Sequence, residues 1–251
     1  LAHHSDVGGM SPGSMSGTAT EIFQEGLRIP SVMYLKKGKV VPDIQKMILA
    51  NVRTPEERKG DLAAQIAANN TAIRRVRELI DRYGFDEFNG YCDALIAYCE
   101  RRMRAEIAEI PDGTYTFHDW MEDDGIEDKA YRINVTVHVE GDGLIVDYYG
   151  SDPQAKGPVN GTLGVAWGAA YNAVLQLTDA SIPKNSGCFR PIKVVAPPGT
   201  VANPVMPAAS VAGNTEGQPR IIASVQRALA QAIPDKVSAG EGGTGLNLLL
   251  G

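Results

Sequence analysis

The chain has 251 residues, of which 43% are hydrophobic and 22% charged, a composition typical of a globular protein with a buried core. Its formal net charge of −6 argues against nucleic acid or an anionic membrane surface as the main partner. No run approaches the roughly 18 consecutive apolar residues of a membrane helix. Three cysteines without C-x-x-C spacing favour neither a disulfide framework nor a zinc cluster, so we expect a cytoplasmic protein.

The first half of the sequence predicts a loop region followed by helices. Glycine and proline interrupt residues 1–42 too often for a long helix, and we expect loop with short strands there. Residues 43–110 are the predicted helical part, with apolar positions at helical spacing in two runs separated by Gly84 as a C-cap. We expect the two helices to form an antiparallel hairpin that buries Cys92 and Cys99.

The second half, residues 111–251, predicts mixed α/β structure. In YRINVTVHVEGDGLIVDYYG, apolar residues alternate with polar ones on both sides of a Gly-Asp-Gly turn, which indicates a β-hairpin. The segment LGVAWGAAYNAVLQL predicts a helix of small residues, PIKVVAPPGT a strand that ends in a Pro-Gly turn, and QPRIIASVQRALAQAI an amphipathic helix. The fold class is therefore α+β, with a helical hairpin, antiparallel β-hairpins and further helices. Because the chain starts on Leu1 and stops inside an apolar run, we expect it to be the central part of a larger chain.

The opening stretch LAHHSDVGGMSPGS offers a candidate metal site. Imidazole and carboxylate ligands suit Mn²⁺, Zn²⁺ or Fe²⁺, and carboxylate with water suits Mg²⁺. In an extended chain, His4 and Asp6 point to one side and His3 to the other, so one ion binds all three only if the backbone turns. The glycines after Asp6 permit such a turn. Further ligands would have to come from elsewhere, and an ordinary polar turn is the alternative.

A polar stripe lies within the first predicted long helix. Asp61, Gln65 and Asn69 recur at intervals of four residues in GDLAAQIAANN, with alanine and isoleucine between them. A stripe of this kind is either a solvated face or a face buried against something polar.

Several loops at the ends of predicted elements carry polar side chains, namely Asp147, Asn160, Asn185 and Asn214. Loops at strand ends carry binding groups more often than other segments, although turn formation alone accounts for the glycine and proline around them. Asn214 is either an N-cap or a ligand for an anionic group at the next helix. The acidic run MEDDGIED lacks the spacing of a calcium loop, and we expect a solvated turn there.

Seven segments, in order along the whole chain, resemble the hydantoinase B/oxoprolinase family. They are HHSDVGGMSPGS, ATEIFQEGLRIP, NVRTPEERKGDLAAQIAAN, YCERRMRAEIAEIPDG, DYYGSDPQAKGPVN, IPKNSGCFRPI and GNTEGQPRI. The family includes B subunits of ATP-dependent N-methylhydantoinases, the C-terminal half of 5-oxoprolinases, and subunits of acetone and acetophenone carboxylases. The resemblance implies that residues 1–251 are a partial family domain that lacks its N-terminal and C-terminal parts.

The resemblance also implies a chemistry in two steps. A hydantoinase A-type partner uses ATP to phosphorylate the substrate, so ATP is not bound by this chain. The B-type chain then completes hydrolysis of a cyclic amide, of hydantoin or 5-oxoproline type, at a site holding Mn, Zn or Mg. By position His3 matches a metal ligand best and His4 second, with Asp6 a ligand or a group that positions one. Asp61, Gln65, Asn69, Asp147, Asn160, Asn185 and Asn214 fall in the resembling segments and are carried as site candidates.

Two other functions stay open. Within the family, the chain could be a subunit of an ATP-dependent ketone carboxylase, because both chemistries would use the same metal. In another class, it could be a non-catalytic scaffold for the A-type partner. All three functions imply a hetero-oligomer.

Overall fold

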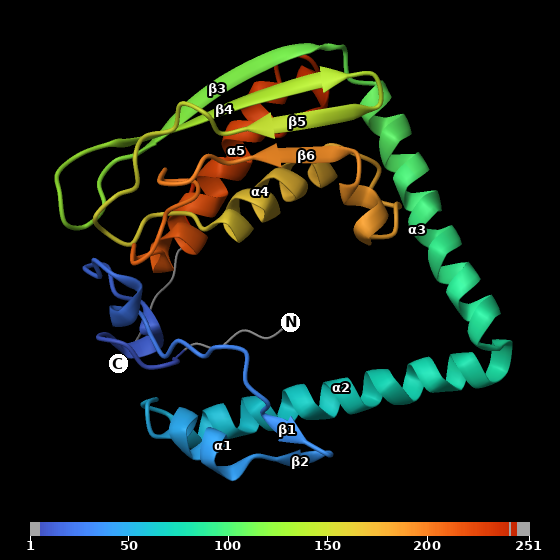
Figure 1. Cartoon of the computed structure of the whole chain (residues 1–251). Helices are drawn as coiled ribbons and strands as arrows, with labels where there is room; N and C mark the ends of the chain where they lie inside the picture. Colours follow the sequence, from blue (N-terminus) through green and yellow to red (C-terminus); the bar gives the residue numbers. More distant parts are fainter. Residues whose placement is uncertain (1–5, 241, 245–251) are drawn as a thin grey trace. The chain divides into compact units, whose positions relative to one another are not determined.

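A computed structural model describes residues 6–240 and 242–244 (Figure 1). Within them the chain divides into two compact units. Residues 6–16 and 23–91 belong to the first unit, and residues 17–22 and 92–244, without residue 241, belong to the second. Each unit is described by itself.

The first unit is loop and helix, as the glycine and proline content of its beginning predicts. Its 3-10 turn at Pro12–Ser14 and its two-stranded ribbon of β1 (Leu35–Lys36) and β2 (Lys39–Val40) confirm the expected loop with short strands. Helix α1 (Pro42–Leu49) packs against α2 (Pro55–Tyr83), and each begins with proline, which lacks the N–H that a first helical turn leaves unpaired. A further 3-10 turn, Ile22–Gln24, lies where the chain returns to this unit.

Gly84 separates α2 from α3 (Phe85–Ala108), as predicted. Its φ of +84° favours glycine, and its N–H donates to the carbonyl of Ile80. The expectation that Cys92 lies in the core is wrong, because Cys92 is exposed whereas Cys99 is fully buried. Only the C-terminal half of α3 packs into the core of the second unit. Since α2 and α3 divide between the two units, their antiparallel packing stays a prediction.

The second unit contains a four-stranded sheet of order β3-β4-β5-β6. The strands are β3 (Gly113–Met121), β4 (Tyr131–Glu140), β5 (Gly143–Asp147) and β6 (Ile192–Val195); the first three are antiparallel and β6 is parallel to β5. The alternation in β4 places every second residue, from Tyr131 to Val139, in the core. The predicted β-hairpin and the predicted strand β6 are confirmed.

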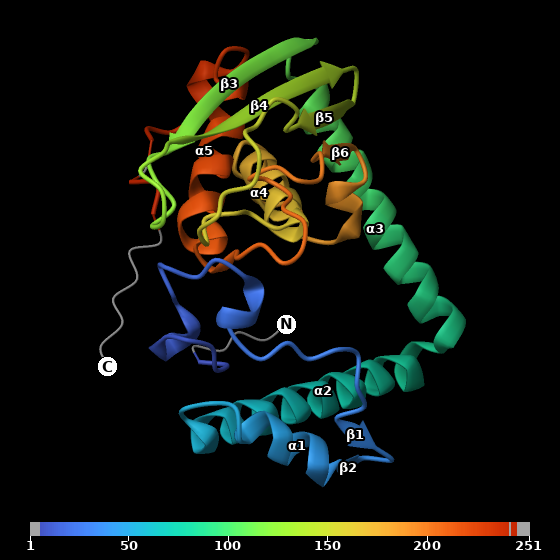
Figure 2. The same cartoon turned by 60° about the vertical axis from the view of Figure 1, so that its left-hand side comes forward.

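Two helices cover one face of this sheet, α4 (Leu163–Gln176) and α5 (Gln218–Leu229) (Figures 1 and 2). Helix α4 presents four fully buried alanines, which allow close packing against α5, and α5 packs on β3 and β4. The predicted amphipathic helix ends earlier than expected, at Leu229, and a short 3-10 turn follows at Pro234–Lys236. Two further turns, Ser186–Phe189 and Gly213–Gly217, precede β6 and α5, the second of them in π-helical geometry.

Strand β3 is not predicted by the sequence pattern. In GTYTFHDWM the residues alternate between half-buried and exposed positions, and Tyr115, Phe117 and Met121 pack on the core. The polar Asp119 interrupts this face and the apolar Trp120 lies on the exposed one, which weakens the period-two signal in the sequence. Over the described part of the chain, no helix is long and apolar enough to cross a membrane.

Candidate functional site

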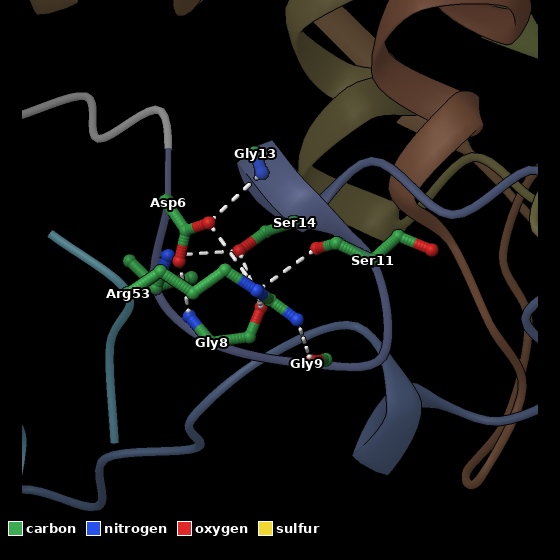
Figure 3. Close-up of polar contacts among 8 residues, drawn as sticks. Asp6, Gly8, Gly9, Ser11, Gly13, Ser14 and Arg53 are labelled. Carbon is green, nitrogen blue, oxygen red and sulfur yellow. Dashed lines mark hydrogen bonds and ion pairs between the residues drawn. The ribbon is translucent and has the colours of Figure 1, made fainter. Parts of the chain in front are cut away.

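The loop after the histidine pair is organised around the carboxylate of Asp6 (Figure 3). Asp6 is 6% exposed. Its Oδ1 accepts a hydrogen bond from the N–H of Gly8, and its Oδ2 accepts one from the N–H of Gly13, both at 2.9 Å. Nη1 of Arg53 donates to Oδ2 at 3.3 Å. The side chain therefore closes residues 6–13 into a compact turn.

Ser14 and two glycines complete this turn. The Ser14 hydroxyl accepts from the N–H of Val7 and donates to the carbonyl of Gly8, each at 2.8 Å. Gly8 and Gly9 have φ values of +92° and +85°. A Cβ atom on Gly8 would lie 2.4 Å from the carbonyl oxygen of Asn51, so both the conformation and the close approach require glycine there.

Arg53, which no sequence pattern singles out, joins this loop to the segment before α2. Besides Asp6, its Nη1 donates to the carbonyl of Ser11 at 3.0 Å, and its Nη2 donates to the carbonyl of Gly9 at 2.8 Å. A planar guanidinium can serve several acceptors at once in this way. No spacing rule identifies the arginine, because its partners lie more than 40 positions away. The signal available is its place in the resembling segment NVRTPEERKGD.

The electrostatics of the loop favour an ionised Asp6. Burial acts to raise the pKa of this carboxyl group, but the hydrogen bonds from Gly8 and Gly13 and the charge of Arg53 together outweigh it and lower the pKa below its ordinary value. Oδ2 accepts two hydrogen bonds and Oδ1 accepts one. Counting the described residues alone, one lone pair of Oδ1 is left for a further donor or a cation.

The predicted metal ligands His3 and His4 lie outside the described residues. In the part of the chain that is described, no three histidine, cysteine, aspartate or glutamate side chains cluster as a metal site. Asp6 is the first described residue, and its carboxylate is fixed by the loop. The metal site stays a prediction.

The polar stripe is on one side of α2, in the unit that contains Asp6, as the helical spacing predicts. Asp61 forms an ion pair with Arg58, with 3.1 Å between its Oδ2 and Nη2 of the arginine. Gln65 is partly buried and Asn69 is exposed. The stripe therefore passes from a half-buried end near the start of the helix to a solvated one.

Asn160 lies in the second unit and is completely buried. Its Oδ1 accepts from the N–H of Ala155 at 2.8 Å, and its Nδ2 donates to the carbonyls of Ala155, Gly157 and Ala209. All of these partners are backbone groups, so the side chain ties together the two loops that precede α4 and α5. This geometry is that of a structural clamp.

The other three candidates in the second unit lie at separate positions. Oδ1 of Asp147, at the end of β5, accepts from the N–H of Tyr149, and Oδ1 of Asn185 accepts from the N–H of Gly187, each at 2.8 Å. Asn214 is exposed within the turn Gly213–Gly217. Of its two alternatives, the N-cap role is wrong, because Ala212 and Gly217 occupy the N-cap positions of that turn and of α5, and the role as a ligand stays a prediction.

The acidic run MEDDGIED is not a solvated turn throughout, which corrects the expectation from its charge. Asp124 is 1% exposed. Its Oδ1 accepts from the N–H groups of Ile126 and Glu127, and its Oδ2 accepts from the Gly157 N–H and the Tyr131 hydroxyl, at 2.7 to 3.0 Å. Asp124 therefore fixes the loop at Gly157, close in sequence to Asn160.

Comparison with known proteins identifies the family. The family model described as Hydantoinase B/oxoprolinase matches residues 1–251. The chain belongs to this family. It is 37% identical over 253 residues to the B subunit of a putative D-/L-hydantoinase from a Pseudomonas species, covering 96% of this chain and 43% of that one. It is 33% identical over 248 residues to the beta subunit of the caprolactamase from Pseudomonas jessenii, covering 98% of this chain and 42% of that one.

Two solved structures share the fold of this chain. The ATP-dependent caprolactamase of Pseudomonas jessenii superposes with a TM-score of 0.85 at 32% identity, over 92% of this chain and 40% of that one. A nucleotide-free acetone carboxylase superposes with the same TM-score at 17% identity, over 95% of this chain and 34% of that one, which shows a shared fold. The chain spans less than half the length of these relatives. The hydantoinase and caprolactamase relatives are named as a B subunit and a beta subunit.

Proposed function

We propose that this chain is part of a B-type subunit of an ATP-dependent amidohydrolase that opens a cyclic amide of hydantoin or 5-oxoproline type. In this proposal a hydantoinase A-type partner phosphorylates the substrate with ATP, and the B-type chain completes the hydrolysis. The family match over the whole chain supports the assignment. Three relatives at 32–37% identity are named as a hydantoinase subunit, a caprolactamase subunit and a 5-oxoprolinase.

The single observation that carries the location of the site is the Asp6–Arg53 clamp. It fixes the backbone from Asp6 onward, close after His3 and His4 in the sequence, and the described residues leave one lone pair on Oδ1 of Asp6 unused. Imidazole and carboxylate donors fit Mn²⁺ or Zn²⁺. A divalent ion bound there would supply Lewis-acid activation of the amide or of water. Asp6 would then orient the histidine-bearing segment and would provide at most one oxygen to the ion.

Measurement of metal content and turnover tests this proposal. The full-length protein with its A-type partner is analysed for Mn, Zn and Mg and assayed for ATP-coupled hydrolysis of hydantoin and 5-oxoproline. We expect about one ion per chain, lost together with turnover in the variants His3→Ala and His4→Ala. His118→Ala is the matched control, because His118 is an exposed histidine of β3 in the second unit.

Other results would contradict the proposal in distinguishable ways. Stoichiometric metal that survives both histidine substitutions would place the metal site elsewhere. An active complex without metal would favour the scaffold function. Carboxylation of acetone or acetophenone with bicarbonate, without hydrolysis of cyclic amides, would establish the alternative ketone carboxylase.

A further inference from the structure

A groove of about 590 Å³ lies wholly within the second unit. It is lined by residues of α4 and α5, which pack against each other (Figures 1 and 2), and by the segment 234–240 that follows them. The residues of α5 that line it, among them Ile222, Ala223 and Gln226, recur at intervals of three and four and therefore lie on one face of the helix. The volume of the groove is in the range of small-molecule sites.

Four carboxamide side chains line this groove, those of Asn172, Gln176, Gln218 and Gln226. Three of them form a chain between the two helices. Nε2 of Gln226 donates to Oε1 of Gln176 at 2.7 Å, and Nε2 of Gln176 donates to Oδ1 of Asn172 at 2.8 Å. This chain leaves the amide N–H groups of Asn172 at one end and Oε1 of Gln226 at the other. The half-buried Gln218 forms no side-chain hydrogen bond among the described residues. Unused donors and acceptors of carboxamides therefore line the groove.

The groove has a positive charge, that of Arg227, and its lining includes no acidic residue. Arg227 is exposed, its Cζ lies 5.6 Å from the ring centroid of Phe117, and it pairs with no carboxylate in the described part of the chain. Its Nη2 lies beside the lining residue Gly240, on which a Cβ atom would be 3.0 Å away. A guanidinium over an aromatic ring keeps its N–H groups available at its edges. An accessible, unpaired arginine in a groove without acids favours a carboxylate ligand.

We infer that this groove binds a small organic acid that carries a ureido or primary amide group, such as an N-carbamoyl amino acid. The carboxylate accepts hydrogen bonds from Arg227, the ureido group pairs with the carboxamides, and an aliphatic side chain packs on Ile222, Ala223 and Val237. A ureido group presents N–H and C=O on one edge, as a carboxamide side chain does, so the two can form a pair of hydrogen bonds. A trans secondary amide presents them on opposite edges and cannot.

Other classes of small ligand fit the groove less well. An unmodified amino acid carries an ammonium group, and no acidic side chain lines the groove to neutralise it. Nucleobases and sugars are commonly held against aromatic side chains, and none lines the groove. Ring opening of a hydantoin yields a ureido acid, but binding in the groove requires neither ATP, a metal ion nor the A-type partner. It therefore stands or falls separately from the proposed function.

Saturation-transfer NMR titration of the full-length protein, which detects weak ligands, tests the inference without any turnover assay. The probes are N-carbamoylvaline, N-acetylvaline, valine and isobutylurea at pH 7 and equal ionic strength. They share one carbon skeleton and differ in the ureido, amide, ammonium or carboxylate group. We expect saturable binding of N-carbamoylvaline, about tenfold or more tighter than that of each other probe, because each lacks or replaces one group that the groove recognises.

Two variants locate the bound ligand. Arg227→Gln should weaken N-carbamoylvaline binding about tenfold. Arg101→Gln is the matched control, because it removes the same charge from an exposed arginine of the second unit that does not line the groove. Ala223→Phe fills the groove and keeps Arg227, and we expect it to abolish binding. Urea denaturation checks that each variant folds.

The results that would overturn the inference differ for each of its parts. Binding of N-carbamoylvaline no tighter than that of valine would overturn the site as a whole. Equal binding of N-acetylvaline would overturn the pairing with carboxamides, and equal binding of isobutylurea would overturn the contact between the carboxylate and Arg227. Unchanged affinity in both Arg227→Gln and Ala223→Phe would place the ligand elsewhere on the protein.

Discussion

Asp6 and Arg53 lie 47 positions apart in the sequence, yet Nη1 of Arg53 lies 3.3 Å from Oδ2 of Asp6. The same arginine holds two carbonyls of the loop, and the aspartate holds two of its amides. The pair thus joins the segment that follows the histidine pair to the segment that begins α2. The shape of the candidate metal loop depends on a contact that no local sequence pattern contains.

Substitution Asp6→Asn should open this loop. One carboxylate oxygen becomes an NH₂ group that faces another donor, at a cost of about 1–3 kcal/mol. We expect faster hydrogen exchange at the amides of Gly8 and Gly13, with exchange in α5 unchanged. Asp81→Asn, at an exposed position of α2, serves as the control. Equal protection of the two glycine amides in both variants would mean that the carboxylate does not hold the loop.

The ionised carboxylate of Asp124 stabilises the second unit, and we expect this stabilisation to be lost in acid. Burial acts to raise the pKa of Asp124, but hydrogen bonds from Glu127, Gly157, Ile126 and Tyr131 outweigh it, and the folded-state pKa lies below the ordinary value. The stabilisation is therefore complete above the unfolded-state pKa of about 3.9 and is lost as the pH falls through the lower folded-state pKa.

The variant Asp124→Asn tests this dependence. We expect it to lower the free energy of unfolding by about 2–3 kcal/mol at pH 7 and to flatten the decline below pH 4. Both tryptophans, Trp120 and Trp167, lie in the second unit, so urea denaturation followed by their fluorescence reports on that unit. Asp128→Asn, an exposed residue of the same acidic run, should change little. A parallel acid decline in the Asp124 variant and the unmodified protein would contradict the assignment.

The parts of the fold that the sequence predicts are those whose pattern is local. The alternation of β4 and the small-residue helix α4 each place one continuous apolar face against the core, and such a face is visible in the sequence. Strand β3 has a weaker signal, because Asp119 interrupts the face that Tyr115, Phe117 and Met121 place against the core. It is held through its register with β4, where Thr114 pairs with His138, and a single sequence does not display pairing of this kind.

The roles of the polar residues likewise depend on contacts that are distant in the sequence. Charge alone suggests a solvated turn for Asp124, but its acceptor atoms are used by Gly157, 33 positions away. Arg53 and Arg58 both lie in one charged segment, and only the fold makes one a loop clamp and buries the other. Burial of a charged side chain is decided by tertiary contacts, so sequence reasoning identifies the segment and not the residue.

We expect substitution of Asn160 to reduce the stability of the second unit, and any loss of turnover to follow from that loss of stability. Asn160→Ala removes four hydrogen bonds to buried backbone groups, and we expect a loss of about 2–4 kcal/mol in the free energy of unfolding. Asn172→Ala, on α4, is the control, because the exposed Asn172 side chain accepts a hydrogen bond from Gln176 on the helix surface rather than from buried backbone. Turnover lost without any loss of stability, in urea denaturation followed by tryptophan fluorescence, would instead support a direct role in the reaction.

Substitution of alanine for two glycines of the first unit should change its stability in opposite directions. Gly8 has a φ of +92°, and a Cβ atom there would meet the Asn51 carbonyl at 2.4 Å, so Gly8→Ala should cost about 1–3 kcal/mol or more. Gly60 lies inside α2, and a Cβ atom on it meets nothing within 4 Å, so Gly60→Ala should stabilise the helix by about 0.5–1 kcal/mol. Hydrogen exchange of α2 and of the Asp6 loop measures both effects locally, since the tryptophans lie in the other unit. A loss of stability on Gly60→Ala would contradict the open surface at that position, and an unaffected loop in Gly8→Ala would contradict its strained turn.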